Sequence, residues 1–334
     1  MLIILLILSL LIILLSCELF TNGIEWLGKK LKLGDAVVGS ILSAIGTCLP
    51  ETIIPIIAIL CAYQNYDSKD IAVGAIVGAP FMLGTLAFFV VGMSVILFEK
   101  VRKSNFKMNI DRKILQRDMI FFIITYTLSI TASFIADDNH ILKYGMAILL
   151  IIIYVFYVLL TLKNDNVTQE KIELLYMTSF LNVRPTLTNI ILQITISLLG
   201  IFIGANLFVK NIEILSRMLG ISTLIVSFIL APVATELPEK FNSIVWIRKR
   251  KDSLALGNIT GAMVFQSCIP MAIGIVFTSW NLDSITILSA FLTLTEALFI
   301  YFWVKGRKTL TFLPLTIGGV FYAIFIVFVL GILA

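Results

Sequence analysis

Long apolar runs alternate with short polar segments along the whole chain of 334 residues. A helix needs about 20 apolar residues to cross the hydrocarbon core of a membrane, so each run predicts a transmembrane helix. The pattern therefore predicts an all-α polytopic membrane protein with ten transmembrane helices. The expected spans are residues 1–20, 35–63, 71–97, 119–136, 141–162, 189–209, 221–247, 254–280, 285–304 and 310–333.

The first apolar run could also be a cleaved leader. It has no basic segment before it and no small-residue cleavage site, and the sequence LLSC at residues 14–17 resembles a lipoprotein site only faintly. We expect this run to be retained as the first span.

Basic residues are concentrated in alternate loops. With the N-terminus outside, the five inside loops hold 20 of the 25 Lys and Arg residues, and one more, Lys240, lies within a span. This bias predicts a multi-pass protein of the cell membrane with both termini outside. The basic clusters at residues 99–113 and 248–251 are interpreted as signals of topology, and we expect no nucleic-acid partner.

The composition narrows the possible chemistry. Charged residues make up 13% of the chain, whereas a soluble domain has about 25%, so no large soluble domain fits. The four cysteines lie in apolar runs without metal-ligand spacing, and His140 is the single histidine. These features argue against an intramembrane enzyme and predict no cofactor. The expected partners are inorganic cations and the lipid bilayer, and the sequence does not specify the oligomeric state.

The chain contains an internal repeat. Residues 19–51 align without a gap with residues 207–239, with 13 identities in 33 positions that include the end of each segment, GTCLPE and ATELPE. IAVGAIVGAPF and LALGNITGAMVF follow as a second matched pair. Five spans in each half, an odd number, would invert the second copy, as in many secondary transporters. We expect repeats at residues 1–163 and 189–334, with cores at 34–87 and 221–275, joined by a cytoplasmic linker at 164–188.

The repeat cores combine prolines with carboxylates. Six of the eight prolines lie in spans two, three, seven and eight: Pro50, Pro55, Pro80, Pro232, Pro238 and Pro270. Glu51, Glu236 and Glu239 fall near the middle of their spans, where each charge costs about 2.5–3.5 kcal/mol and needs compensation. Lys240 follows Glu236 by four residues, so an internal ion pair is the alternative for Glu236.

Oxygen atoms for a hard cation are available around these carboxylates. They belong to the hydroxyls of Thr47 and Thr235, the amides of Asn258 and Gln266, and carbonyls that the prolines leave free. We interpret Gly74, Gly78, Gly257 and Gly261 as packing positions that let helices approach closely. Glu296 in span nine is expected to be buried against a polar partner or to lie near an interface, with a transport role as the less favoured alternative.

The two motifs and their G-x-x-x-G segments resemble the alpha-repeats of the sodium/calcium exchanger family, within the cation/calcium antiporter superfamily. The resemblance covers both repeat cores and the ten-span layout. It implies that Glu51 and Glu239 are the central cation-binding glutamates and that Thr47 and Thr235 add oxygen ligands. In the family the motif reads roughly GTSLPE, followed by GNxxGSNxxN/D.

This chain departs from the family pattern at several ligand positions. Cys48 and Glu236 stand in place of serine, Ala75 in place of asparagine, and Leu83 and Gln266 where each motif ends in Asn or Asp; Ala79 and Ala262 replace further serines. These changes leave the identity and number of the ions open.

We therefore expect a secondary-active antiporter that exchanges Ca²⁺ for Na⁺ by alternating access, with ions bound at the midplane. Spans two, three, seven and eight would form the core, and spans one and six would move against it. A proton-coupled cation exchanger of the same fold is one alternative, because an apolar site favours the protonated form of a carboxylate. A non-transporting exchanger-like membrane protein is the other.

Overall fold

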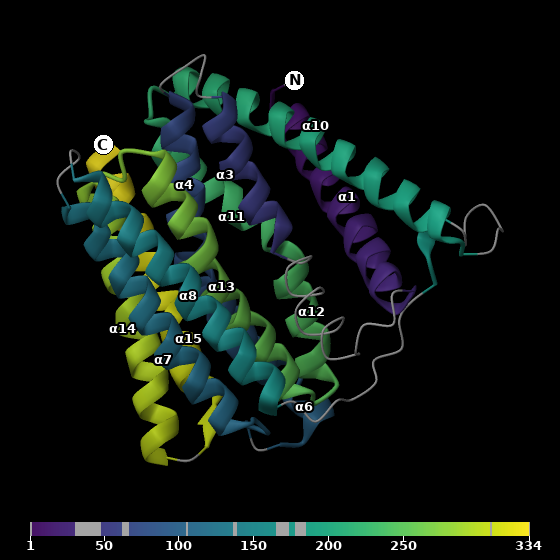
Figure 1. Cartoon of the computed structure of the whole chain (residues 1–334). Helices are drawn as coiled ribbons and strands as arrows, with labels where there is room; N and C mark the ends of the chain where they lie inside the picture. The colour runs from purple at the N-terminus through teal and green to yellow at the C-terminus, as the bar shows by residue number, and fades with distance from the viewer. Residues whose placement is uncertain are drawn as a thin grey trace.

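The computed structural model describes residues 2–30, 48–61, 67–104, 106–135, 139–164, 174–177, 185–307 and 309–333. This part of the chain is almost entirely helical (Figure 1). The elements are α1 (Leu2–Lys30), α3 (Leu49–Cys61), α4 (Asp67–Met82), η2 (Leu83–Ala87), α5 (Phe88–Leu97), α6 (Glu99–Arg102), β1 (Lys107–Met108), α7 (Arg112–Thr131), η3 (Ala132–Phe134), α8 (His140–Asn164), α10 (Leu187–Leu219), α11 (Thr223–Thr235), α12 (Leu237–Arg248), α13 (Asp252–Phe277), α14 (Ser284–Arg307), β2 (Leu310–Thr311) and α15 (Phe312–Leu333).

The expected all-α membrane fold is confirmed. Within the described residues, 8 helices are long and apolar enough to cross a membrane. The other two expected spans, the second and the seventh, contain the shorter apolar helices Glu51–Leu60 and Thr223–Pro232. The seventh span is divided into α11 and α12, and residues 35–47 of the second lie outside the described part. The two spans that hold the LPE motifs are therefore the ones without a long continuous helix in the described residues.

Helices α1 and α10 are longer than the sequence suggested, since they continue to Lys30 and Leu219 instead of ending near residues 20 and 209. They pack along each other in opposite directions at one side of the molecule (Figure 1). Gly204 lies against Ile12 and Ile13, so the two backbones come close. Buried residues of α1 and α10 form a hydrophobic cluster with α3, α4 and α11 that is separate from the main core.

Helices α3, α4, α11 and α13 lie between this pair and the bundle of α7, α8, α14 and α15 (Figure 1). Gly74 and Gly78 of α4 face the backbone of α11, where an added Cβ would collide with the carbonyl oxygens of Leu224 and Phe228. Pro232 has no N–H to donate to the Phe228 carbonyl, and Gly78 approaches that same oxygen. The packing interpretation of Gly74 and Gly78 is confirmed.

The second glycine pair has different surroundings. Among the described residues no heavy atom lies within 4 Å of a Cβ built on Gly257, and Gly261 approaches the hydroxyl of Tyr157 at 3.8 Å. The repeat alignment would place residues 36–44 against these glycines, and that segment lies outside the described part. The expected packing role of Gly257 and Gly261 therefore stays a prediction.

The outer helices pack against the core helix of the opposite half. Helix α13 contacts α7 and α8, whereas α5 and the π-helical η2 contact α15 and α14. Thr125 and Ser129 of α7 hydrogen-bond to Ser267 of α13, at 2.7 and 3.0 Å. This reciprocal arrangement interlocks the two halves, because neither core helix is covered mainly by its own half.

Several loops that we expect inside the cell meet at one end of this bundle. The guanidinium of Arg102 donates to both carboxylate oxygens of Asp252, at 2.7 and 2.9 Å, and to the carbonyl of Ile247. Strand β1 pairs with β2 in an antiparallel register, with Lys107 opposite Thr311. These contacts join the connections after α5, α12 and α14, which are three of the five basic loops.

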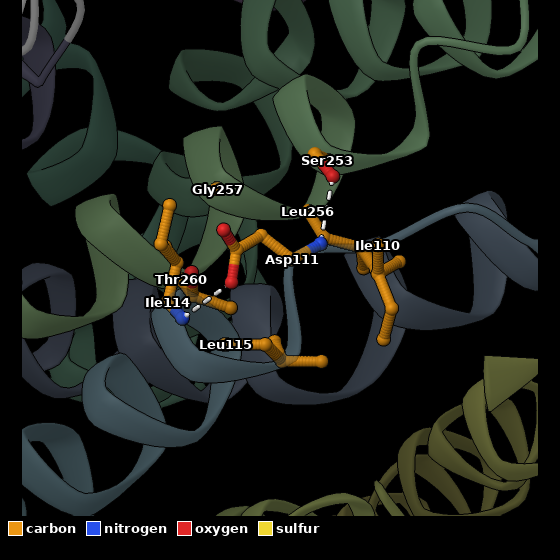
Figure 2. A pocket seen from close by; sticks show the side chains of 8 residues that line it. All are labelled: Ile110, Asp111, Ile114, Leu115, Ser253, Leu256, Gly257 and Thr260. Atoms are coloured by element: carbon orange, nitrogen blue, oxygen red, sulfur yellow. Dashed lines mark hydrogen bonds between the residues drawn. The ribbon is translucent and has the colours of Figure 1, made fainter. Parts of the chain in front are cut away.

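A small pocket lies beside these contacts, between the start of α7 and the start of α13. Figure 2 shows that Asp111 accepts a hydrogen bond from the backbone N–H of Ile114, and that the N–H of Asp111 donates to Ser253. Asp111 is thus the N-cap of α7. Of the described residues that line this pocket, none is an expected cation ligand.

Replacing Arg102 with Met should destabilise the protein. The change leaves the 2% exposed side chain of Asp252 without its ionic partner, and breaking a buried pair in this way typically costs about 3–5 kcal/mol. We expect a clear fall in the melting temperature of the detergent-purified protein. Lys100→Met removes an exposed charge from the same short helix and should leave the melting temperature nearly unchanged. Equal melting temperatures for the two variants would contradict the role of this pair.

Candidate cation-binding site

Glu51 lies in the first turn of α3, which begins at Leu49. Its side chain is 4% exposed, and neither carboxylate oxygen accepts a hydrogen bond from a described residue. The start of a helix carries a partial positive charge and unpaired N–H groups, which favour a carboxylate there. Pro50 is the second residue of this helix, so its missing N–H costs no intrahelical hydrogen bond. The LPE motif therefore lies in the first turn of α3.

Glu236 occupies the break between α11 and α12, with φ −86° and ψ 7°. Its N–H donates to the Pro232 carbonyl at 3.1 Å, and its carbonyl accepts from the Lys240 N–H at 3.2 Å. The break is therefore narrow, and the two helices remain nearly continuous. Pro238 is the second residue of α12, as Pro50 is of α3, so both LPE motifs start a helix in the same way.

The ion pair considered for Glu236 is present. The ammonium of Lys240 donates to Oε2 of Glu236 at 3.1 Å, while Oε1 of Glu236 accepts no hydrogen bond from a described residue. Both side chains are buried, at 0% and 6% exposure. Glu51 is within electrostatic reach of both Lys240 and Glu236. Three buried ionisable side chains thus interact electrostatically near the start of α3 and the start of α12.

Two of the expected ligands lie outside what the structure describes. Thr47 is outside the described residues. The backbone of Glu239 lies in the first turn of α12, at the position that Glu51 has in α3, but its side chain is not described. Both stay predictions. Thr235 is described, is 1% exposed and lies beside Glu51; its hydroxyl donates to the Ala231 carbonyl at 3.0 Å, which leaves its oxygen lone pairs available.

The two amide candidates, Asn258 and Gln266, lie on α13, which packs against both α3 and α12. Gln266 is 2% exposed, and its Oε1 accepts no hydrogen bond from a described residue. The Nδ2 of the half-buried Asn258 likewise has no partner there. A buried amide oxygen without a donor is costly, so a ligand for Gln266 is the expected compensation. The structure does not bring three or more His, Cys, Asp or Glu side chains together as a metal cluster among the described residues.

Two polar residues near the core were missed by the sequence analysis. Tyr322 of α15 lies within electrostatic reach of Glu236, and its ring stacks on Phe81 at 5.7 Å between centroids. Asp118 of α7 is 1% exposed and accepts hydrogen bonds from Thr260 at 2.7 Å and Tyr157 at 3.2 Å. For Tyr322, the signal in the sequence was a tyrosine within an otherwise aliphatic span. Asp118 precedes the expected fourth span by one residue, so the sequence analysis placed it in a loop.

The expected burial of Glu296 is confirmed. It is fully buried on α14 near the backbone of Gly318, and neither of its carboxylate oxygens accepts a hydrogen bond from a described residue. The polar group that acts on Glu296 is a backbone group, that of Gly318, and among the described residues no side chain donates a hydrogen bond to its carboxylate. Glu296 is not among the groups that act electrostatically on Glu51 or Glu236.

The long apolar helices and the buried carboxylates between them are those of a polytopic membrane protein with charged groups in its core. A profile of the sodium/calcium exchanger protein family matches residues 1–163 and 189–334, so the chain belongs to this family. The resemblance inferred from the two LPE motifs is thereby confirmed, and the family is one of transporters, not enzymes.

Relatives and solved structures agree with this assignment. The chain is 24% identical to inner membrane protein YrbG of Escherichia coli over 288 residues, covering 84% of this chain and 81% of that protein. It is 24% identical over 271 residues to an uncharacterized membrane protein of Methanocaldococcus jannaschii, covering 81% and 80%. The fold is similar to that of the H⁺/Ca²⁺ exchanger CAX, with a TM-score of 0.73, 17% identity and coverage of 98% and 82%. It is also similar to that of the sodium–calcium exchanger NCX_Mj, with a TM-score of 0.59, 22% identity and coverage of 98% and 99%.

Replacing Gln266 with Met should weaken cation binding while preserving the fold. Methionine has a similar volume but offers no amide oxygen, and one interaction with a charged partner is worth about 1.5–3 kcal/mol, or roughly tenfold to a hundredfold in affinity. Calorimetric titration of the purified protein with Ca²⁺ measures the change. Thr195→Val, at an exposed position on α10, is the matched control and should bind as the parent does. Unchanged affinity in Gln266→Met would remove this residue from the site.

Proposed function

We propose that the protein is a secondary-active antiporter that exchanges Ca²⁺ for Na⁺ across the cell membrane by alternating access. The observation that carries this proposal is the buried Glu51 beside the Glu236–Lys240 pair, where α3 and α12 begin inside the membrane-spanning core. Uncompensated charge at this depth is costly, so a transported cation is the natural partner of a carboxylate whose oxygens accept no hydrogen bond from the described residues.

The charge of the site suits this cargo. With Glu239 included, three carboxylates face one ammonium, which leaves two net negative charges. One Ca²⁺ or two Na⁺ would neutralise them. Thr235, Gln266 and Asn258 would supply neutral oxygens, with Thr47 as a further expected ligand, because hard cations prefer oxygen atoms.

Alternating access needs a part of the molecule that moves. The α1–α10 pair shares a hydrophobic cluster with α3, α4 and α11 and is separate from the main core. The interlocked bundle of α5, α7, α8, α13, α14 and α15 would stay in place. We propose that α1 and α10 slide across α3 and α11 and expose the ions alternately to the two sides. In this scheme the halves at residues 1–163 and 189–334 are inverted repeats, and both termini face outside.

A proton-coupled exchanger is the second candidate. Cys48 and Leu83 stand where the family pattern has oxygen ligands, which weakens the case for Na⁺. The H⁺/Ca²⁺ exchanger CAX also gives a higher TM-score than NCX_Mj, 0.73 against 0.59. In this case the buried carboxylates would carry protons during the return step.

Transport into proteoliposomes tests the proposal. Vesicles loaded with Na⁺ and diluted into Na⁺-free buffer should take up Ca²⁺, and a parallel set should carry only a pH gradient. Glu51→Gln and Glu239→Gln should each reduce uptake to background while the protein still inserts, because each removes a negative charge from the site without changing its size.

The outcomes separate the candidates. Glu18→Gln, at an exposed position on α1, is the control and should transport as the parent does. Uptake with the pH gradient alone would select the proton-coupled exchanger. Full exchange in both Glu51→Gln and Glu239→Gln would refute the site, and cation binding without flux in either gradient would indicate a non-transporting protein.

A further inference from the structure

The two repeats differ in one pair of residues beside their LPE motifs. The alignment of residues 19–51 with 207–239 places Cys48 opposite Glu236 and, one residue beyond its end, Thr52 opposite Lys240. In the first half the Thr52 hydroxyl donates to the Cys48 carbonyl at 2.9 Å, so this pair is neutral. In the second half the same four-residue spacing holds an ion pair, with 3.1 Å between Lys240 Nζ and Glu236 Oε2.

The ion pair lies inside the candidate site. Lys240 acts electrostatically on Glu51, which belongs to the other half of the chain, and Glu236 does so as well. An ammonium has three N–H donors. Among the described residues Lys240 donates from its side chain to Glu236, so its remaining donors and its charge are available to the neighbouring carboxylates.

The pair is buried, with Glu236 0% and Lys240 6% exposed. Glu236 lies within electrostatic reach of Tyr322, whose ring stacks on Phe81, and Phe81 packs against Phe325 with 4.5 Å between ring centroids. Buried charges have lost their hydration, so a nearby opposite charge has to offset the cost of desolvation. A buried ion pair is a weak means of stabilising a fold compared with apolar packing. A role in balancing transported charge therefore explains it better than stability does.

We propose that the ammonium of Lys240 is a tethered cation that takes the place of one transported monovalent ion. This inference rests on the proposed antiport function. Its fixed positive charge occupies the second half of the site next to Glu236 and reduces the negative charge that mobile ions must balance. The protein therefore moves one monovalent cation fewer per Ca²⁺ than it would with the same carboxylates and no lysine.

Charge variants of the pair give opposite expectations. Lys240→Met keeps an unbranched side chain one atom shorter and removes the charge, so the site should bind one more monovalent cation per Ca²⁺. Glu236→Gln removes a negative charge, so the site should bind one fewer monovalent cation per Ca²⁺. The double variant restores the parent charge and should return the coupling ratio to the parent value, and Lys240→Arg should keep it.

The coupling ratio is measured in proteoliposomes whose membrane potential is set with K⁺ and valinomycin. At a fixed Na⁺ gradient, or pH gradient if protons couple, the potential at which net Ca²⁺ flux reverses gives the number of monovalent ions per Ca²⁺. Equilibrium binding of radioactive Na⁺ to the purified proteins gives a second count that needs no transport. Relative to the parent, the number of monovalent ions per Ca²⁺ should rise by one in Lys240→Met, fall by one in Glu236→Gln and stay unchanged in the double variant.

A purely structural pair predicts a different result. Both single variants would then lose stability or transport rate while the coupling ratio and the number of bound ions stayed at the parent values, and that result would overturn the proposal. If Lys240→Met fails to insert, Glu236→Gln still decides, because its shift has the opposite sign. Absence of Ca²⁺ flux in the parent protein under both gradients would refute the antiport function, whereas an unchanged ratio in active variants would refute only the tethered cation.

Discussion

A carboxylate buried in the middle of a membrane has to be balanced by a cation, a proton or the positive end of a helix, because the lipid and the apolar core offer nothing else. The arrangement around Glu51 and Glu236 follows from this constraint. Both residues lie at the start of a helix, where the end of the helix carries a partial positive charge. Lys240 compensates one carboxylate permanently, and Glu51 is left without a hydrogen-bond donor among the described residues. The candidate site thus combines a carboxylate that already has an ion-pair partner with one that has none among the described residues.

The prolines and glycines of the repeat cores shape the helices around the candidate site: two prolines lie at helix starts, and the glycines of α4 allow close packing. Pro50 and Pro238 stand at the second position of α3 and α12, where a missing N–H is tolerated and the start of the helix is favoured. Pro232 leaves the Phe228 carbonyl without its usual donor, and Gly78 brings the backbone of α4 next to it. Close contact between α4 and α11 therefore depends on a proline in one helix and glycines in the other. This contact crosses from the first half of the chain to the second, as does the electrostatic contact between Glu51 and Lys240.

The bundle around the core gives the molecule a rigid part and a separable part. Helices α13 and α5 are each covered by outer helices of the opposite half, and the Arg102–Asp252 pair joins the loops at one end. The long α1–α10 pair has its own hydrophobic cluster with α3, α4 and α11. An interlocked bundle resists rearrangement, whereas two helices that contact only a few neighbours through one apolar cluster can move against them with less loss of contact. The proposed movement is therefore based on the division of the apolar core into two clusters, one of which contains α1 and α10.

The sequence by itself determined the helical membrane class, the repeat, the position of the carboxylates in the spans and the Glu236–Lys240 spacing. These features are local: span length, the four-residue period and direct self-alignment report them without any knowledge of packing. The tertiary structure alone decided that outer helices cover the opposite half, that Tyr322 lies near Glu236, and that Asp118 is buried against Thr260 and Tyr157. It also decided that α1 and α10 extend far beyond their apolar runs. Each of these depends on contacts between helices distant in the chain, and apolar patterns alone do not specify which helix faces which, because lipid and protein interior are equally apolar.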